Sequence, residues 1–314
     1  MTDELYSGPI IDAHIHLWDL AGDHYPWLMP GGSFGPKGLF DSLKKNYVLE
    51  DYRRDIAGQN VIASVHIEAL WSIEEGQANE TRWLETLDKS DNLAIRYTAG
   101  VPFRRPDTDA LLREQASFEN VVAIRQTIAW NADPDRTMMP DPNISRLPEW
   151  RAAIDTIVEL GLKLELLLYP WQADEVLELA TAYPDLTVIV DHVASPMYQS
   201  EEGLAAWRRY VLTMAKAPNV LMKISSVIGY IPDPTQEKVS AIIGHVVEAF
   251  GADRLMIGSD FPPGSLAGFS YAEVFGMYRE ALKHLPADEQ YAIFCGTAAR
   301  EFRIPVEEIL ASRA

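Results

Sequence analysis

Cysteine is nearly absent from this sequence, since Cys295 is the only one among 314 residues. A lone thiol excludes an intrachain disulfide and is typical of a chain that folds in a reducing compartment. We expect Cys295 to be a small, buried apolar side chain. Long apolar runs are also missing, and the first residues, MTDELYSG, lack the apolar core of a secretion signal. These absences predict a soluble cytoplasmic protein.

Positive charge is scarce as well, with 27 lysines and arginines against 46 aspartates and glutamates and a formal net charge of −19. So acidic a surface repels nucleic acid and anionic membranes, and we therefore expect a small molecule as the partner instead. An anionic substrate would need a local basic pocket. Because 47% of the residues are hydrophobic, the chain can bury a large core, and we expect residues 1–314 to form a single domain.

Three common catalytic motifs are missing too. Ser259 lies in the run GSDF, which lacks the second glycine of a nucleophile elbow. No glycine-rich phosphate loop precedes a helix, and no CxxC pair exists. A covalent serine or cysteine mechanism is therefore unsupported. What remains is a set of histidines with one carboxylate, which suits the activation of water.

The pattern that is present repeats a short β-branched segment, a polar loop and an amphipathic segment. The expected strands cover residues 9–16, 61–68, 94–101, 121–126, 162–169, 186–192, 220–225 and 254–260. The expected helices cover residues 49–58, 73–89, 108–117, 148–160, 173–183, 201–216, 235–250 and 271–284. Eight strands that alternate with helices indicate a parallel sheet with right-handed crossovers, and eight strands close a barrel. The predicted fold class is therefore α/β, a (β/α)8 TIM barrel.

Polar residues alternate along several of these strands. His66 and Glu68 share one face of the second strand. Lys163, Glu165 and Tyr169 share one face of the fifth, and Lys223 and Ser225 share one face of the seventh. A polar face toward the barrel axis and an apolar face toward the helices explain this alternation.

The first strand, in the run PIIDAHIHLW, ends with His14 and His16. Alternate side chains of a strand share a face, so the two histidines point the same way, about 7 Å apart along the chain. This spacing suits two imidazoles that converge on one metal ion, or two donors that converge on one substrate oxygen. Two hydrogen-bonded structural histidines are the alternative. The end of a barrel strand, however, is where barrel enzymes place their chemistry.

Polar and aromatic side chains gather at the ends of other expected strands. The candidate catalytic and substrate-binding residues among them are His66, Glu68, Arg125, Tyr169, His192, Ser225 and Asp260, with Trp18 after the first strand. Asp260 can take a proton from an attacking water and return it to the leaving group, although it could also only initiate the turn before Pro262. Asp191 and His192 are adjacent, so only one of them can face the axis of an extended strand, and we expect this to be His192.

Arg125 suits a bidentate pair with a substrate carboxylate, and an internal ion pair with Glu165 or Glu68 is equally compatible with its position. Tyr169 and Trp18 are candidate walls of a pocket.

Two connections are unusually long, residues 17–47 and residues 127–146. The first carries several aromatic residues and the run PGGSFGPKG. Both leave the ends of strands, so we expect them to be binding loops on the active face, with an exposed insertion as the alternative for the first.

Several short motifs resemble those of the amidohydrolase superfamily: DAHIHLWD, YPWL, VDHVASP, KISS, IGSDFP and CGTAAREF. They extend over nearly the whole chain, and they are most similar to the amidohydrolase-2 branch, which contains sugar lactonases and 2-pyrone-4,6-dicarboxylate lactonase. The resemblance implies a distorted (β/α)8 barrel that hydrolyses lactone rings. It also implies that His14 and His16 bind a metal or a carbonyl, that His192 is the histidine of the sixth strand, and that Asp260 is the general base.

The sequence departs from the superfamily pattern at two strands. The fourth reads AIRQT where many members place a lysine or glutamate that bridges two metals, and the fifth reads LELLLY where many carry a metal-binding histidine. We therefore expect at most one divalent cation, with zinc bound by His14, His16, Asp260 and water. A metal-free mechanism, in which the histidines and an arginine polarise the carbonyl, is the alternative.

These expectations predict a hydrolase that opens an anionic or polyhydroxylated lactone from sugar or aromatic breakdown. His14, His16 and His192 would stabilise the oxyanion, Asp260 would activate water, and Arg125 would hold a carboxylate. The alternatives are a metal-dependent decarboxylase of an aromatic or unsaturated acid, a metal-free lactone isomerase and a non-catalytic barrel that only binds a ligand. Because barrels of this size often pair, a homodimer is left open.

Overall fold

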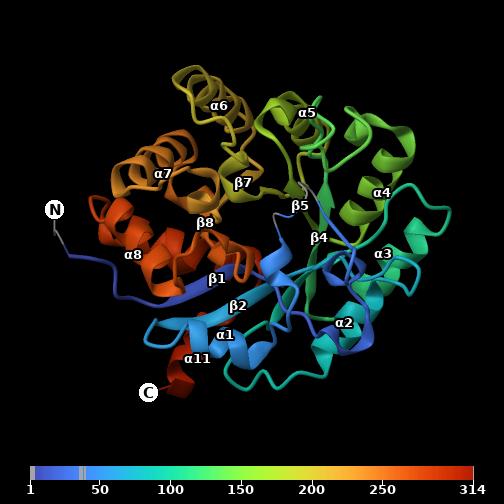
Figure 1. The fold of residues 1–314 in the computed structure, drawn as a ribbon, viewed down its shortest axis with the longest axis horizontal. Coiled ribbons are helices and arrows are strands. Elements are labelled where there is room, and N and C mark those ends of the chain that lie inside the picture. Colours follow the sequence, from blue (N-terminus) through green and yellow to red (C-terminus); the bar gives the residue numbers. More distant parts are fainter. Residues whose placement is uncertain (1–3, 35–37, 39, 314) are drawn as a thin grey trace.

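The structure, a computed structural model, describes residues 4–34, 38 and 40–313. Eight parallel strands form one sheet in which each strand pairs with the next along the chain. They are β1 (Ile10–Ile15), β2 (Val61–Ile67), β3 (Arg96–Gly100), β4 (Val121–Thr127), β5 (Lys163–Leu167), β6 (Val188–Val190), β7 (Val220–Ile224) and β8 (Leu255–Ile257). Helices surround these strands in Figure 1, which confirms the predicted (β/α)8 TIM barrel.

The helices follow the strands in the predicted order. They are α1 (Leu49–Asp55), α2 (Ala78–Glu85), α3 (Thr108–Ala116), α4 (Pro148–Glu159), α5 (Ala173–Ala182), α6 (Glu201–Met214), α7 (Gln236–Phe250), α8 (Tyr271–Leu282), α9 (Ala287–Tyr291), α10 (Thr297–Glu301) and α11 (Val306–Arg313). The helix expected over residues 73–89 is much shorter, because Gly76 before it has a φ of 91°, which an α-helix cannot contain. No helix of the described chain is long and apolar enough to cross a membrane.

The middle of the barrel interior is charged. His14 on β1, Glu165 on β5 and Lys223 on β7 contact one another, although their strands lie far apart around the ring. Such contacts require side chains that point to the axis, as the polar alternation predicts. The Phe302 ring lies 5.5 Å from Lys223 Nζ, and it belongs to an apolar cluster that also contains the buried Cys295.

The barrel is closed by hydrogen bonds between β1 and the segment that follows β8, rather than by hydrogen bonds to β8 itself. The backbone N–H of Asp260 donates to His14 O, and the N–H of His16 donates to Phe261 O, both at 2.8 Å. The side chain of Asp12 adds a third link, because its Oδ1 accepts from Ser259 N at 2.8 Å. The pairing of β1 with β2 also shifts register twice. The barrel is therefore distorted, and residues of the predicted site form its seam.

Strands β6 and β8 end earlier than expected, at Val190 and at Ile257. Residues just beyond them have left-handed backbones, with φ of 54° at His192 and 60° at Asp260, so an extended strand cannot continue there. Because the backbone changes direction between Asp191 and His192, both side chains turn inward. The expectation that only one of these two residues can face the axis is therefore wrong.

The two long connections, 17–47 and 127–146, leave the C-terminal ends of β1 and β4. Trp18 and Tyr47 close the base of the first one through two backbone hydrogen bonds of 2.8 and 3.0 Å. Within its run PGGSFGPKG, residues 35–37 lie outside the described residues, as does residue 39.

Candidate active site

Three side chains that are distant in sequence meet at the C-terminal mouth of the barrel. His14 lies on β1, His16 directly follows it, and Asp260 lies beyond β8. The Nε2 atoms of the two histidines are 3.3 Å apart. Oδ1 of Asp260 is 3.5 Å from Nε2 of His14 and 3.3 Å from Nε2 of His16. The three residues predicted as metal ligands therefore place their potential ligand atoms at the corners of a nearly equilateral triangle.

The hydrogen-bond partners of the other ring nitrogens determine where the protons lie. His16 Nδ1 is 2.8 Å from the carbonyl oxygen of Ile67, which can only accept, so Nδ1 carries the proton. His14 Nδ1 lies 3.3 Å from Asp191 Oδ1, which favours the same tautomer. The two Nε2 lone pairs then face the Asp260 carboxylate, so that three acceptors meet without a donor. A cation between them removes this repulsion.

This donor set fits a zinc ion. Two neutral imidazoles and one carboxylate are common zinc ligands, and tetrahedral bonds of about 2.0–2.1 Å separate neighbouring ligands by roughly 3.3 Å. The hydrogen bond from His16 Nδ1 to Ile67 O is of the outer kind that usually orients metal-binding histidines, and the Asp191 carboxylate lies 3.3 Å from His14 Nδ1. Burial lowers the pKa of His14 well below its usual value, so its ring is neutral.

A second group of donor atoms lies deeper, on the other side of the His14 ring. His14 Nδ1, Glu165 and Asp191 are close enough to hold a cation. The Lys223 ammonium already supplies the positive charge for this group. It lies 2.7 Å from Glu165 Oε1, 3.4 Å from His14 Nδ1 and 3.9 Å from Asp191 Oδ1. Among the described residues, this leaves one candidate metal site, at the mouth.

The buried charges around the site are unbalanced. The two cationic side chains are Arg125 and Lys223. The four carboxylates are those of Glu68, Glu165, Asp191 and Asp260. A divalent cation brings their formal charge to zero. In its absence, burial and the neighbouring Asp191 raise the pKa of Glu165 to about 8.

His192 lies beside the triangle. Its Nε2 is 4.0 Å from Asp260 Oδ1, and its ring centroid is 4.7 Å from that of His14. Its Nδ1 is 2.8 Å from the hydroxyl oxygen of Ser225. Ser225 does not line the cavity and instead orients His192. Burial lowers the pKa of His192 and keeps the ring neutral.

Arg125 has carboxylate partners within the protein. Its Nε is 3.1 Å from Asp191 Oδ2, and one terminal nitrogen is 3.6 Å from Glu68 Oε1. Burial alone would lower the pKa of Arg125, but the attraction of Asp191 and Glu68 raises it. Of the two interpretations, the geometry therefore matches the internal ion pair, although Asp191 was not among the expected partners.

A cavity of about 410 Å³ opens above these residues. The predicted site residues that line it are His16, Trp18, Glu68, Arg125, Tyr169, His192 and Asp260. His14 forms part of the floor beneath them and is fully buried. His66 does not reach the cavity: its Nδ1 accepts from Leu17 N at 3.3 Å, and its Nε2 lies 3.7 Å from Glu80. His66 therefore packs behind His16 rather than against a substrate.

Several lining residues were not identified from the sequence. They are Trp27, Phe34, Phe40, Met138, Met197, Tyr230 and Leu266. The first four lie in the two long connections, so their region was predicted but their roles were not. Tyr230 and Leu266 follow β7 and β8, and only their position after a strand end could have signalled them.

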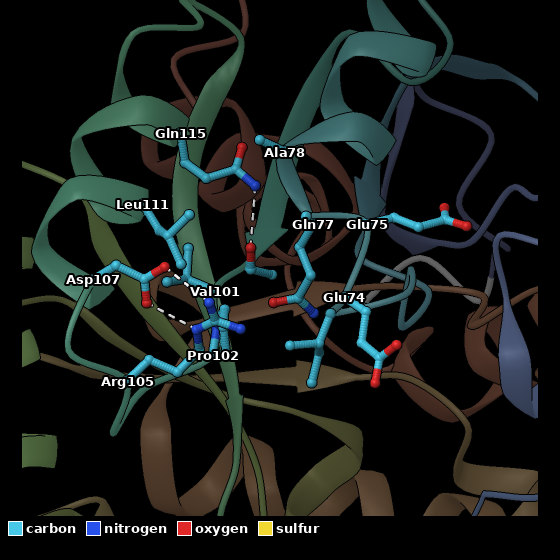
Figure 2. A pocket seen from close by; sticks show the side chains of 13 residues that line it. Glu74, Glu75, Gln77, Ala78, Val101, Pro102, Arg105, Asp107, Leu111 and Gln115 are labelled. Atoms are coloured by element: carbon cyan, nitrogen blue, oxygen red, sulfur yellow. Dashed lines mark hydrogen bonds and ion pairs between the residues drawn. The ribbon is translucent and has the colours of Figure 1, made fainter.

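A smaller cavity of about 180 Å³ lies between the N-terminus of α2 and the end of β3 (Figure 2). Its polar groups are partly used within the protein: Gln115 donates to Gly100 O at 3.1 Å, and Arg105 pairs with Asp107 at 2.8 Å. None of the predicted site residues lines it. The candidate active site is therefore the larger cavity.

Residues 11–304 match the family model described as Amidohydrolase, so the chain belongs to this amidohydrolase family. The resemblance seen in the sequence motifs is thus confirmed. The chain is 32% identical over 295 residues to the uncharacterized protein y4mH of Sinorhizobium fredii, which covers 94% of this chain and 98% of the relative. It is also 27% identical over 303 residues to the L-fucono-1,5-lactonase of Burkholderia ambifaria, and this match covers 94% of this chain and 95% of the relative.

The fold is shared with a crystal structure of an amidohydrolase from Burkholderia multivorans with bound zinc. The TM-score is 0.77 at 22% sequence identity, over 95% of this chain and 100% of the other. At this identity the likeness extends to the fold alone.

Proposed function

We propose that this protein hydrolyses a lactone in the cavity at the C-terminal mouth of the barrel. The observation that carries the proposal is the triangle of acceptor atoms from His14, His16 and Asp260 at the cavity floor. It combines a cation site with a carboxylate that reaches the cavity, as the activation of water requires. The L-fucono-1,5-lactonase of Burkholderia ambifaria, to which the chain is similar, supports a cyclic ester as the substrate.

Asp260 acts as the base in this proposal. It accepts a proton from the water whose oxygen attacks the lactone carbonyl carbon. A carboxyl group ordinarily has a pKa of about 4, and the pKa of Asp260 lies lower still, so the carboxylate is ionised at neutral pH. When the tetrahedral intermediate collapses, the ring C–O bond breaks and Asp260 returns the proton to the leaving alkoxide. One water is consumed, and the product is an open-chain hydroxy acid.

His192 stabilises the developing oxyanion. If the Ser225 hydroxyl donates to Nδ1, the proton of His192 lies on Nε2, which faces the cavity beside Asp260. This N–H then donates to the carbonyl oxygen as its negative charge grows. A divalent cation, zinc by its donor set, supplies Lewis-acid polarisation of the same carbonyl when it is bound.

A decarboxylase is less well supported by the cavity. Such an enzyme must hold the carboxylate that its substrate loses. Among the described residues that line the cavity, Arg125 is the one lysine or arginine, and it already faces Asp191 and Glu68.

The test is a panel of lactones assayed with a pH indicator, because each opened ring releases one proton at neutral pH. Nuclear magnetic resonance of the product separates the alternatives: a hydroxy acid supports hydrolysis, carbon dioxide a decarboxylase, and a rearranged ring an isomerase. A panel without turnover by the zinc-loaded protein would contradict the proposal.

The variant Asp260→Asn retains the size of the side chain but loses the base. We expect its kcat to fall at least 100-fold, a typical loss for a missing general base. Asp185→Asn is the matched control, because Asp185 is exposed and precedes β6 at the opposite end of the barrel. Equal melting temperatures would show that both variants fold, and near-normal turnover by Asp260→Asn would rule out the assigned role.

A further inference from the structure

One wall of the active-site cavity is aromatic and comes from the connection after β1. The Trp27 ring is 5.6 Å from that of Trp18, 6.1 Å from that of Phe34 and 5.8 Å from that of Phe40, all edge to face. Phe34 and Phe40 stack on each other at 6.1 Å. Met138, Met197 and Leu266 add apolar surface from other connections. We call Trp18, Trp27, Phe34 and Phe40 the aromatic wall.

The polar atoms of the aromatic side chains that line the cavity already form hydrogen bonds within the protein. Trp18 Nε1 donates to Lys45 O at 2.7 Å, and Trp27 Nε1 donates to Ala69 O at 2.8 Å. The hydroxyl of Tyr169 donates to the carbonyl oxygen of Arg136, and that of Tyr230 donates to Ser195 Oγ at 3.1 Å. The aromatic side chains therefore offer a substrate ring faces and edges, with few hydrogen-bond donors for sugar hydroxyls.

Among the residues that the structure describes, the cavity also has no spare positive charge for an anionic substrate. Arg125, the one cationic side chain among its described lining residues, faces two carboxylates. Glu68 and Asp260 line the same cavity. Even with a divalent cation bound, the formal charges of the buried cluster only reach zero. A substrate carboxylate would thus be buried without a counter-charge, which is strongly unfavourable.

We propose that the substrate is an uncharged lactone that carries an apolar group, a hydrocarbon chain or ring, packed against the aromatic wall. This inference rests on the proposed hydrolysis, and it replaces the anionic or polyhydroxylated lactone expected from the sequence. The ester lies at the floor, beside His192 and Asp260, and the apolar group extends toward Phe34 and Phe40. The cavity volume of about 410 Å³ lies within the range of about 300–1,000 Å³ that is typical of small-molecule sites.

The experiment compares four lactones with the same six-membered ring in the zinc-loaded protein. They are δ-decalactone, unsubstituted δ-valerolactone, gluconolactone and a δ-valerolactone that carries a ring carboxylate. We expect kcat/KM for δ-decalactone to exceed that for the other three, which lack its hydrocarbon chain, by about 100-fold, because an apolar pocket that buries several methylenes discriminates on this scale. A higher kcat/KM for gluconolactone or for the carboxylate would overturn the inference and leave the proposed hydrolysis intact.

Variants of the aromatic wall test where the apolar group lies. Phe34→Ala and Phe40→Ala should each raise KM for δ-decalactone about tenfold, and they should raise KM for δ-valerolactone much less, because it has no hydrocarbon chain to pack against the aromatic wall. Phe118→Ala is the matched control, because Phe118 is half-buried near Arg82 and does not line the cavity. Met138→Gln provides an independent variant that should lower the same preference. An equal loss for both lactones would indicate a structural effect and contradict the assignment.

A binding measurement keeps the inference testable if no lactone is hydrolysed, an outcome that would overturn the proposed function by itself. The melting temperature of the protein is measured with δ-decalactone and with gluconolactone. Stabilisation by δ-decalactone alone, lost in Phe34→Ala, would still support an apolar ligand. Stabilisation by gluconolactone alone, or by neither compound, would overturn the inference.

Discussion

Lys223 determines the charge of the buried half of the site. It is fully buried, and its ammonium lies 2.7 Å from Glu165 and 3.4 Å from His14 Nδ1. Removing one partner of such a pair leaves an uncompensated charge in a medium of low dielectric constant. The ammonium occupies the space on the Nδ1 side of His14, where His14, Glu165 and Asp191 could otherwise hold a cation.

Replacing Lys223 by methionine should therefore destabilise the protein by about 3–5 kcal/mol, the usual cost of breaking a buried ion pair. The double variant Lys223→Met/Glu165→Gln should recover much of this loss, because the unpaired carboxylate is neutralised. Urea denaturation measures both effects. Lys238→Met is the control, since Lys238 is exposed and its ammonium contacts only backbone carbonyls, those of Pro232 and Asp233. A single variant as stable as the wild type would show that Lys223 does not neutralise the cluster.

At the scale of elements, helix α5 anchors the second long connection. The hydroxyl of Ser145, near the end of that connection, donates to Glu175 on α5. Arg146 makes two hydrogen bonds of 2.8 Å to Glu178, one turn further along the helix. The connection also contributes Met138 to the cavity. These contacts position one side of the substrate pocket.

Glu175 gives this anchor a predictable pH dependence. Burial raises the pKa of Glu175, so the folded chain binds its proton more tightly than the unfolded chain. The free energy of unfolding contributed by this group therefore falls as the pH rises above the unfolded pKa of about 4.3. Glu175→Gln removes this loss. The free energy of unfolding of the variant, relative to that of the wild type, should therefore increase as the pH rises from 4 to 7. Urea denaturation across this range measures it, with the exposed Glu202→Gln as control; a difference that does not change with pH would contradict the prediction.

The order of the elements was predictable from the sequence because local patterns encode it. Alternating polar and apolar residues reveal a strand with two different faces, and they placed Glu165 and Lys223 on the axis side. The pairing of these two residues was not predictable, because strand alternation states which side of the barrel a residue faces but not which neighbour it meets. The identity of the ion pairs depends on the closed ring.

The backbone after β6 was not predictable either. Four consecutive non-glycine residues, 192–195, have φ between 47° and 56°. Isolated residues of these types avoid this region, so their sequence favours an extended strand. Tertiary contacts override that preference: Trp207 Nε1 donates to Val193 O at 2.8 Å, and Ser225 contacts His192. Strained backbone of this kind is concentrated at functional sites, where it directs side chains that a regular strand would turn away.

At the scale of the whole molecule, the acceptor triangle of His14, His16 and Asp260 coincides with the seam of the barrel. The backbone of His14, His16 and Asp260 takes part in the hydrogen bonds that join β1 to the segment after β8, and their side chains form the acceptor triangle. A cation bound there would hold the first and last strands together. Its binding would therefore raise the free energy of unfolding of the whole barrel.

Removing the metal should consequently lower the stability of the entire barrel. A cation that binds only the folded chain contributes about 2.7 kcal/mol at a free concentration of 100 times its Kd. We expect chelator-treated protein to melt at a lower temperature and zinc to restore it, with about one equivalent retained after dialysis. His16→Asn should abolish this shift, whereas His284→Asn, which alters an exposed histidine on the surface, should not. If zinc neither raises the melting temperature nor remains bound, the acceptor triangle does not hold a cation, and the metal-free mechanism then applies.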